Sequence, residues 1–117
     1  MLFVCYPKCT TCQRAKKFLD ERGEGYTYRH IKEENPSLEE LRTWWQASGL
    51  PLKKFFNTSG LQYKALALKD KLPHMSEEEQ LALLAGDGML VKRPILVGED
   101  FVLVGFKEPE WTAKLEK

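Results

Sequence analysis

Two of the three cysteines in this chain are separated by two residues, in the segment Cys9-Thr10-Thr11-Cys12. A thiol is a nucleophile only as the thiolate, and the unpaired N–H groups at a helix N-terminus stabilise that charge. The segment follows an apolar run and opens an amphipathic pattern, so we expect Cys9 at the start of a helix. Cys9 is therefore the candidate nucleophile, and Cys12 is the candidate resolving thiol.

The spacing of the pair sets a condition on its geometry. Residues three apart in a helix have Cβ atoms about 5–6 Å apart, whereas a disulfide needs about 3.5–4.5 Å. A bridge between Cys9 and Cys12 therefore requires Cys9 to lie just outside the helix.

The cysteine pair could also be a structural metal site or a pair of inert thiols. A structural zinc site would need two more ligands, and Cys5, His30 and His74 lack the paired spacing typical of such sites. We predict no metal site. The pair could instead be inert buried thiols, but its position between a strand and a helix favours redox use. Cys5 lies inside the apolar run and is expected to be a small core residue.

A second candidate feature is Arg93-Pro94, directly before a strand. A cis bond is possible before Pro94. Considered alone, Lys92 and Arg93 indicate only a solvated basic loop. If the fold brings Arg93 to Cys9, its guanidinium would lower the thiol pKa and hold an anionic substrate.

The elements around the cysteines predict a βαβ unit. Residues 2–6 are apolar and end at a proline, residues 11–22 have helical periodicity, and residues 26–31 alternate and are rich in aromatic and β-branched types. The two strands should be parallel.

The middle of the chain is predicted to be helical. Capping boxes at Ser37 and Ser76 start two helices. Two short helices are expected between them, over residues 52–56 and 61–68, the second with Leu61 and Leu68 on one side. We expect this insertion, about residues 37–86, to pack on the same core as the strands.

The C-terminal part returns to strand character. Residues 95–97 and 101–104 predict a hairpin, and a last helix opens near Glu108. The order is β-α-β, helices, β-β-α. This predicts one domain, residues 1–117, with an α/β thioredoxin-like fold and a helical insertion after its second strand.

Composition excludes several function classes. Lys and Arg total 18 against 17 for Asp and Glu, and the charges alternate along the chain, which argues against direct nucleic-acid binding. No apolar stretch approaches the ~20 residues of a membrane span, and no basic leader is apparent. Three cysteines with one close pair fit a reducing compartment, so we expect a cytoplasmic protein.

Four segments together resemble the ArsC/Spx family of arsenate reductases, their uncharacterised relatives and Spx-type regulators. They are Tyr6-Pro7-Lys8-Cys9-Thr10-Thr11-Cys12, Phe55-Phe56-Asn57-Thr58-Ser59-Gly60, Asp87-Gly88-Met89-Leu90-Val91-Lys92-Arg93-Pro94-Ile95 and Val104-Gly105-Phe106-Lys107. The resemblance implies a reactive Cys9 and a cis Pro94 preceded by an anion-binding Arg93. Thr10 and Thr11 join Arg93 and Pro94 as candidate substrate- or anion-binding residues.

The chain departs from the family's arsenate reductases at several positions. Those enzymes use one essential cysteine and three arginines, whereas this chain has Cys12 and keeps only Arg93. Asn57 stands at the place of the middle arginine, and Phe106 or Lys107 at the place of the last. The short, uncharacterised ArsC-like members are the most similar in appearance.

The resemblance implies a cytoplasmic thiol–disulfide oxidoreductase related to arsenate reductase. The substrate would be a disulfide or a small oxyanion, and glutaredoxin, glutathione or thioredoxin would be the external thiol donor. No bound cofactor is expected, since no Gly-rich nucleotide loop is present. The alternative is an Spx-like regulator that binds RNA polymerase through a redox switch at Cys9 and Cys12.

Overall fold

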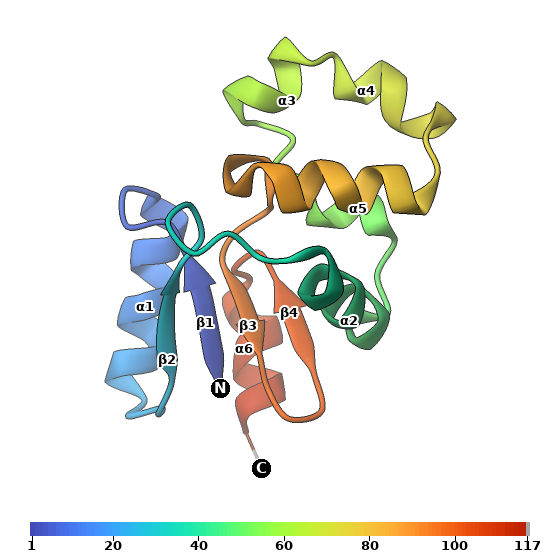
Figure 1. The fold of residues 1–117 in the computed structure, drawn as a ribbon. Helices are drawn as coiled ribbons and strands as arrows, with labels where there is room; N and C mark the ends of the chain where they lie inside the picture. Colours follow the sequence, from blue (N-terminus) through green and yellow to red (C-terminus); the bar gives the residue numbers. More distant parts are fainter. Residues whose placement is uncertain (117) are drawn as a thin grey trace.

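A four-stranded sheet lies at the centre of the computed structural model, which describes residues 1–116. Its order is β2 (Thr27–His30), β1 (Leu2–Cys5), β3 (Ile95–Val97) and β4 (Val102–Val104). The pair β1 and β2 is parallel, and the other two pairs are antiparallel. Figure 1 shows the sheet between two groups of helices. This arrangement confirms the predicted βαβ unit and hairpin.

The two faces of the sheet bury different groups of side chains. Phe3 and Cys5 pack with α1 (Thr10–Glu21) and α6 (Glu108–Leu115), whereas Val4 packs with the helical insertion. Successive residues of a strand point to opposite faces, so the short apolar run of β1 contributes side chains to the hydrophobic cores on both faces of the sheet. The sheet thus fixes the start of α1 relative to β3, the strand that Arg93-Pro94 precedes.

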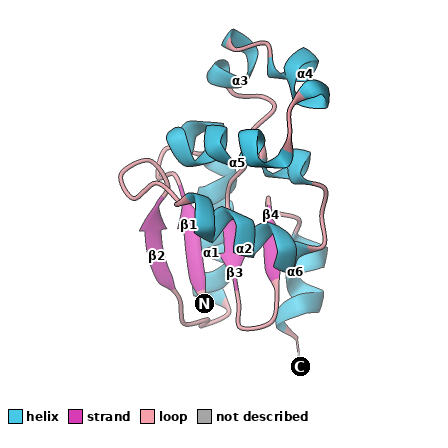
Figure 2. Ribbon diagram, turned by 45° about the vertical axis from the view of Figure 1, so that its right-hand side comes forward, coloured by secondary structure: helices cyan, strands magenta, loops and turns pink. Residues whose placement is uncertain are grey.

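The insertion between β2 and β3 consists of short helices, as Figure 2 shows. They are α2 (Leu38–Ser48), η1 (Leu52–Phe55), α3 (Leu61–Ala65), α4 (Leu68–Lys71), η2 (Leu72–His74), α5 (Glu77–Gly86) and η3 (Gly88–Leu90). Both predicted capping boxes are present, at Ser37 and Ser76. Within residues 1–116, no helix is both long and apolar enough to cross a membrane.

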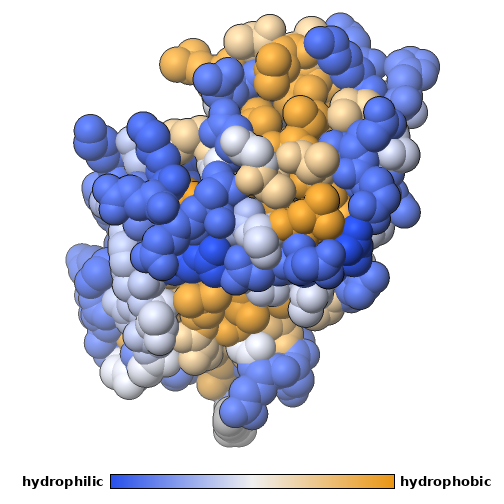
Figure 3. Space-filling view, in the orientation of Figure 1, coloured by the Kyte–Doolittle hydropathy of each residue, from blue (hydrophilic) through white to orange (hydrophobic). Residues whose placement is uncertain are grey.

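The prediction of one helix over residues 61–68 is wrong. Ala67 has a left-handed backbone with φ of 53°, which ends α3 and separates it from α4. Leu68 is buried, but Leu61 is 86% exposed, so the two leucines do not share a buried side. Figure 3 shows apolar side chains gathered on the surface around these helices.

Gly105 connects the Arg93-Pro94 segment to the C-terminal helix. Its N–H donates to the Pro94 carbonyl at 2.8 Å, and its own carbonyl accepts from Trp111 Nε1 at 3.0 Å. The backbone of Gly105 is left-handed, with φ of 76°, and Trp111 is fully buried. The Arg93–Pro94 bond is cis, as the family resemblance implied.

We predict that Gly105→Ala lowers the free energy of unfolding by about 1–2 kcal/mol, because a Cβ is strained in the left-handed region. Urea unfolding measures the change. Gly86→Ala is the matched control, since Gly86 ends α5 with open space around it. That variant should be unchanged or more stable by up to about 1 kcal/mol. Equal losses in the two variants would contradict the role given to Gly105.

Candidate functional site at the start of α1

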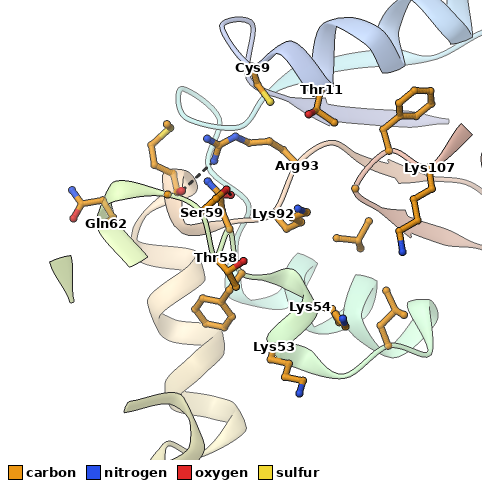
Figure 4. Close-up of a pocket in the computed structure, with 18 of the residues that line it drawn as sticks. Cys9, Thr11, Lys53, Lys54, Thr58, Ser59, Gln62, Lys92, Arg93 and Lys107 are labelled. Atoms are coloured by element: carbon orange, nitrogen blue, oxygen red, sulfur yellow. Dashed lines mark hydrogen bonds between the residues drawn. The ribbon is translucent and has the colours of Figure 1, made fainter. Parts of the chain in front are cut away.

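Cys9 is the residue just before α1, and its backbone is extended, with φ of −84° and ψ of 122°. Its carbonyl accepts the first helical hydrogen bond, from the Gln13 N–H at 3.0 Å. Cys9 therefore lies just outside the helix, as a bridge to Cys12 requires. Figure 4 shows its side chain directed toward Arg93 across the mouth of a cleft.

The surroundings of Cys9 lower the pKa of its thiol. Partial burial acts in the opposite direction and raises the pKa. The backbone N–H and the thiol of Cys12, the N–H of Thr11 and the charge of Arg93 outweigh that burial. These N–H groups belong to the first helical turn, where they have no carbonyl partner within the helix. The arrangement favours a thiolate at Cys9.

Cys12 has the opposite character, although it is only one helical turn away. It is 1% exposed, and the Tyr6 N–H donates to its Sγ at 3.3 Å. A hydrogen bond with the buried Cys5 thiol, burial, and the negative charge of an ionised Cys9 raise the pKa of Cys12. Cys12 is therefore held as a neutral thiol. All three cysteines are free in this structure.

Cys5 is buried, as expected of a core residue, but it also contacts the cysteine pair through Cys12. Its neighbours include the Tyr28 side chain on β2. The contact between Cys5 and Cys12 could not be predicted from the sequence, because it depends on how α1 packs on β1.

Arg93 is held by groups from three directions. Its Nη1 donates to the carbonyls of Met89 at 3.1 Å and Val91 at 3.3 Å, and its guanidinium lies 5.5 Å from the centre of the Tyr6 ring. The Asn57 amide is assigned with its oxygen toward Arg93, where it accepts from both Nη atoms at 3.3 Å. The guanidinium is thus positioned before any ligand arrives.

The segment before Arg93 is fixed to the helical insertion by backbone contacts. Phe56 and Val91 form an isolated antiparallel bridge. The Lys92 N–H donates to the Phe55 carbonyl at 2.7 Å, and the Asn57 N–H donates to the Leu90 carbonyl at 2.8 Å. Elements far apart in the sequence therefore meet at the site.

These elements enclose a cleft of about 1030 Å³ that opens beside Cys9. Thr11 and Arg93 line it, but Thr10 is exposed and does not. Pro94 and Cys12 are buried outside its lining. The structure thus brings Cys9, Thr11 and Arg93 together at the cleft, with Cys12 behind Cys9.

The cleft is also lined by cations that sequence analysis missed or set aside as solvated. They are Arg14, Lys53, Lys54, Lys92 and Lys107. None of these five, nor Arg93, forms an ion pair with a carboxylate in the part of the chain that the structure describes. Lys53-Lys54 was visible as a basic pair, but its distance from Cys9 in the sequence hid its position across the cleft.

The histidines lie outside the cleft. His30 Nδ1 accepts from the backbone N–H groups of Lys32 and Glu33, both at 3.2 Å, which gives this side chain a local structural role. Across residues 1–116, no group of three or more His, Cys, Asp or Glu side chains is arranged to hold a metal ion.

Comparison with known proteins identifies the family. The model of the ArsC family matches residues 5–114. The chain belongs to the ArsC family. It is 56% identical to the uncharacterised protein YusI of Bacillus subtilis over 111 residues, which is 95% of this chain and 94% of YusI. It is 29% identical to the global transcriptional regulator Spx of Staphylococcus haemolyticus, over 89% of this chain and 78% of Spx.

Solved structures of ArsC proteins share the fold. An ArsC family related protein from Bacteroides fragilis superposes with a TM-score of 0.93 and 61% identity, covering 96% of this chain and 94% of that one. The arsenate reductase from Vibrio cholerae gives a TM-score of 0.83 with 28% identity, covering 99% and 98%. The thioredoxin-like fold predicted from the sequence is confirmed.

We predict that iodoacetamide alkylates Cys9 first, at a pH below the ordinary thiol pKa of about 8.5. Cys5 and Cys12 should react only after unfolding, because both are 1% exposed. The alkylation rate should rise with pH through the Cys9 pKa. Arg93→Gln removes a charge that lowers the Cys9 pKa, so the pH profile of its alkylation rate should move to higher pH. Peptide mass mapping identifies the labelled cysteine.

The control for Arg93→Gln is Lys17→Gln, which removes an exposed charge on the outer face of α1. Its profile should match the wild type. Equal, slow labelling of all three cysteines would contradict an activated thiolate at Cys9.

Proposed function

We propose that this ArsC-family protein is a cytoplasmic thiol–disulfide oxidoreductase, with Cys9 as nucleophile and Cys12 as resolving thiol. The observation that carries the proposal is the pairing of two thiols in opposite states within one helical turn. Cys9 is accessible from a cleft and has a lowered pKa, whereas Cys12 is buried, neutral and in contact with it. A nucleophile and a resolving thiol need these two states.

In the first step, the Cys9 thiolate attacks one sulfur of a substrate disulfide. A bond forms between Cys9 Sγ and that sulfur, the substrate S–S bond breaks, and the second substrate sulfur leaves as a thiolate that takes a proton from water. The Arg93 guanidinium and the N–H groups of the first turn of α1 stabilise the charge before attack.

In the second step, Cys12 gives its proton to water and attacks Cys9 Sγ in the mixed disulfide. The Cys9–Cys12 bond forms, and the remaining substrate sulfur leaves as a thiolate. The negative charge of Cys9 is one cause of the raised Cys12 pKa, and that charge is gone once Cys9 is bonded to substrate. Formation of the mixed disulfide therefore eases ionisation of Cys12.

The cycle needs an external thiol to restore the reduced pair. Two thiol groups of the donor are oxidised to one disulfide as the Cys9–Cys12 bond is reduced, so electrons balance over one turnover. Thioredoxin, glutaredoxin or a low-molecular-weight thiol such as glutathione fits this role. The reaction as written uses no bound cofactor.

A disulfide suits this site better than arsenate. Asn57 contacts Arg93 where the family's arsenate reductases have a second arginine, so the oxyanion site beside Cys9 has less charge and fewer bidentate donors. Lys53 and Lys54, which also line the cleft, lie on its far side from Cys9, as Figure 4 shows. Pro94, buried behind Arg93, would shape the groove next to the substrate sulfur.

We predict that Cys9→Ser slows reduction of a model disulfide by at least about 100-fold, because it removes the nucleophile. Cys12→Ser should release the first substrate thiol at a rate close to the wild type and then stop as a mixed disulfide on Cys9. Thiol release and intact-protein mass spectrometry measure both results. Full turnover by Cys12→Ser would contradict the role of Cys12 as resolving thiol. A normal rate of disulfide reduction by Cys9→Ser would contradict the whole mechanism.

A second candidate function is redox-controlled binding to RNA polymerase, favoured by the similarity to the regulator Spx. Formation of the Cys9–Cys12 bond would then change a docking surface instead of completing a catalytic cycle. In a pull-down, RNA polymerase is incubated with the immobilised chain in reducing buffer and in oxidising buffer. We predict that the amount of polymerase recovered is the same in both buffers and equals the background. Capture in one redox state, abolished by Cys12→Ser and without disulfide turnover, would favour the regulator.

A further inference from the structure

The cleft beside Cys9 is much larger than a small oxyanion requires. Its volume of about 1030 Å³ reaches the upper end of the ~300–1,000 Å³ typical of sites for drug-sized ligands. Figure 4 shows that it extends from Cys9 and Thr11, at the start of α1, to Lys53 and Lys54 on the helical insertion. A tetrahedral anion at Arg93 would leave most of this space unused, so the cleft fits an extended ligand.

The cleft has a strong excess of positive charge. Among residues 1–116, its lining contains five cations besides Arg93 and a single carboxylate, that of Glu110. The whole chain has a net charge of only +1, so the excess is local to this surface. Cations without carboxylate partners on several sides of one cleft favour a ligand with several negative charges.

Apolar side chains interrupt the cations along the cleft. Leu50, Phe56, Leu61 and Met89 all contribute to its lining. Leu61 is 86% exposed and Leu50 is 36% exposed, so both offer apolar surface to a bound ligand. A ligand that matches this lining has apolar groups between its negative charges, which is the character of an acidic peptide segment.

We propose that the cleft binds an extended acidic segment of a protein substrate, which presents a cysteine disulfide to Cys9. Aspartate and glutamate side chains flanking that cysteine pair with Lys53, Lys54 and the other cleft lysines, and a large apolar side chain packs on Leu61. This inference rests on the proposed disulfide reduction, because it names the substrate class of the same site.

The test uses three synthetic peptides with one central cysteine, each supplied as its symmetrical disulfide. The three peptides have the same length, and each contains one leucine. The residues that flank the cysteine are acidic in the first peptide, neutral amides in the second and lysines in the third. The fully reduced protein is mixed with each peptide, and release of peptide thiol is followed in a single turnover. We expect the acidic peptide to react at least about 10-fold faster than the lysine peptide at low salt, with the difference shrinking as salt rises.

The variant Lys53→Gln/Lys54→Gln should slow the reaction of the acidic peptide about 3- to 10-fold, the range for loss of two exposed ion pairs. The reaction of the neutral peptide should be unchanged. The matched control is Lys69→Gln/Lys71→Gln, which removes the same charge from exposed positions on α4 outside the cleft. It should stay within about 2-fold of the wild type. Equal effects of the two double variants would overturn the proposal.

A binding measurement separates this inference from the chemistry of Cys9. The Cys9→Ser/Cys12→Ser variant cannot exchange thiols at the cleft, and fluorescence anisotropy of the labelled acidic peptide in its reduced form reports binding alone. Preferential binding of the acidic peptide, weakened by Lys53→Gln/Lys54→Gln and by Leu61→Gln, supports the proposal even if no peptide disulfide is reduced. No thiol release from any peptide would instead refute the proposed reductase function.

Oxidised glutathione, a small disulfide with carboxylates, provides a comparison of ligand size. We expect it to react more slowly than the acidic peptide and to be insensitive to Leu61→Gln. If oxidised glutathione reacts as fast, with the same dependence on Lys53 and Lys54, the cleft binds a small polycarboxylate and the protein-segment proposal is wrong. Equal anisotropy for acidic and lysine peptides would also overturn it.

Discussion

The unpaired N–H groups in the first turn of α1 set the chemistry of this site. They face a cysteine whose extended backbone places it just before the helix, so the field of the helix end acts on Cys9 Sγ. The same turn carries Cys12 inward, where burial and contact with Cys5 keep its proton bound. One short segment of backbone therefore separates the ionisation of two identical functional groups.

The rest of the fold serves to hold this turn against Arg93. The strand β1 anchors the start of α1, and the hydrogen bonds among Pro94, Gly105 and Trp111 connect the segment after Arg93 to the C-terminal helix. The guanidinium itself is fixed by two backbone carbonyls, an amide and an aromatic ring. A preorganised cation of this kind loses little entropy when an anionic ligand arrives.

Much of this arrangement could be predicted from the sequence, because its signals are local. The capping residues at Ser37 and Ser76 and the alternation in the strands each act over a few residues. The position of Cys9 just outside its helix meets the condition that the sequence set for a bridge to Cys12. The resemblance to the ArsC family supplied the cis bond before Pro94, whereas the meeting of Arg93 with Cys9 was a condition that the sequence left open.

The parts that the sequence did not predict depend on packing between distant segments. The break at Ala67 has no glycine or proline to signal it, so periodicity extended one helix through residues 61–68. Contact between Cys5 and Cys12 arises only when α1 packs on β1. Lys53 and Lys54 belong to a solvated surface by composition, and only the fold of the insertion brings them to the cleft that Cys9 shares.

The two sides of the cleft come from different parts of the fold, which can change independently in evolution. The reacting thiols and Arg93 stand on or beside the elements of the sheet, whereas Lys53, Lys54 and Leu61 stand on the insertion between β2 and β3. Substitutions in the insertion can therefore alter what is recognised while the sulfur chemistry stays intact. Divergence of ligand preference among descendants of one ancestor would then be recorded mainly in these short helices.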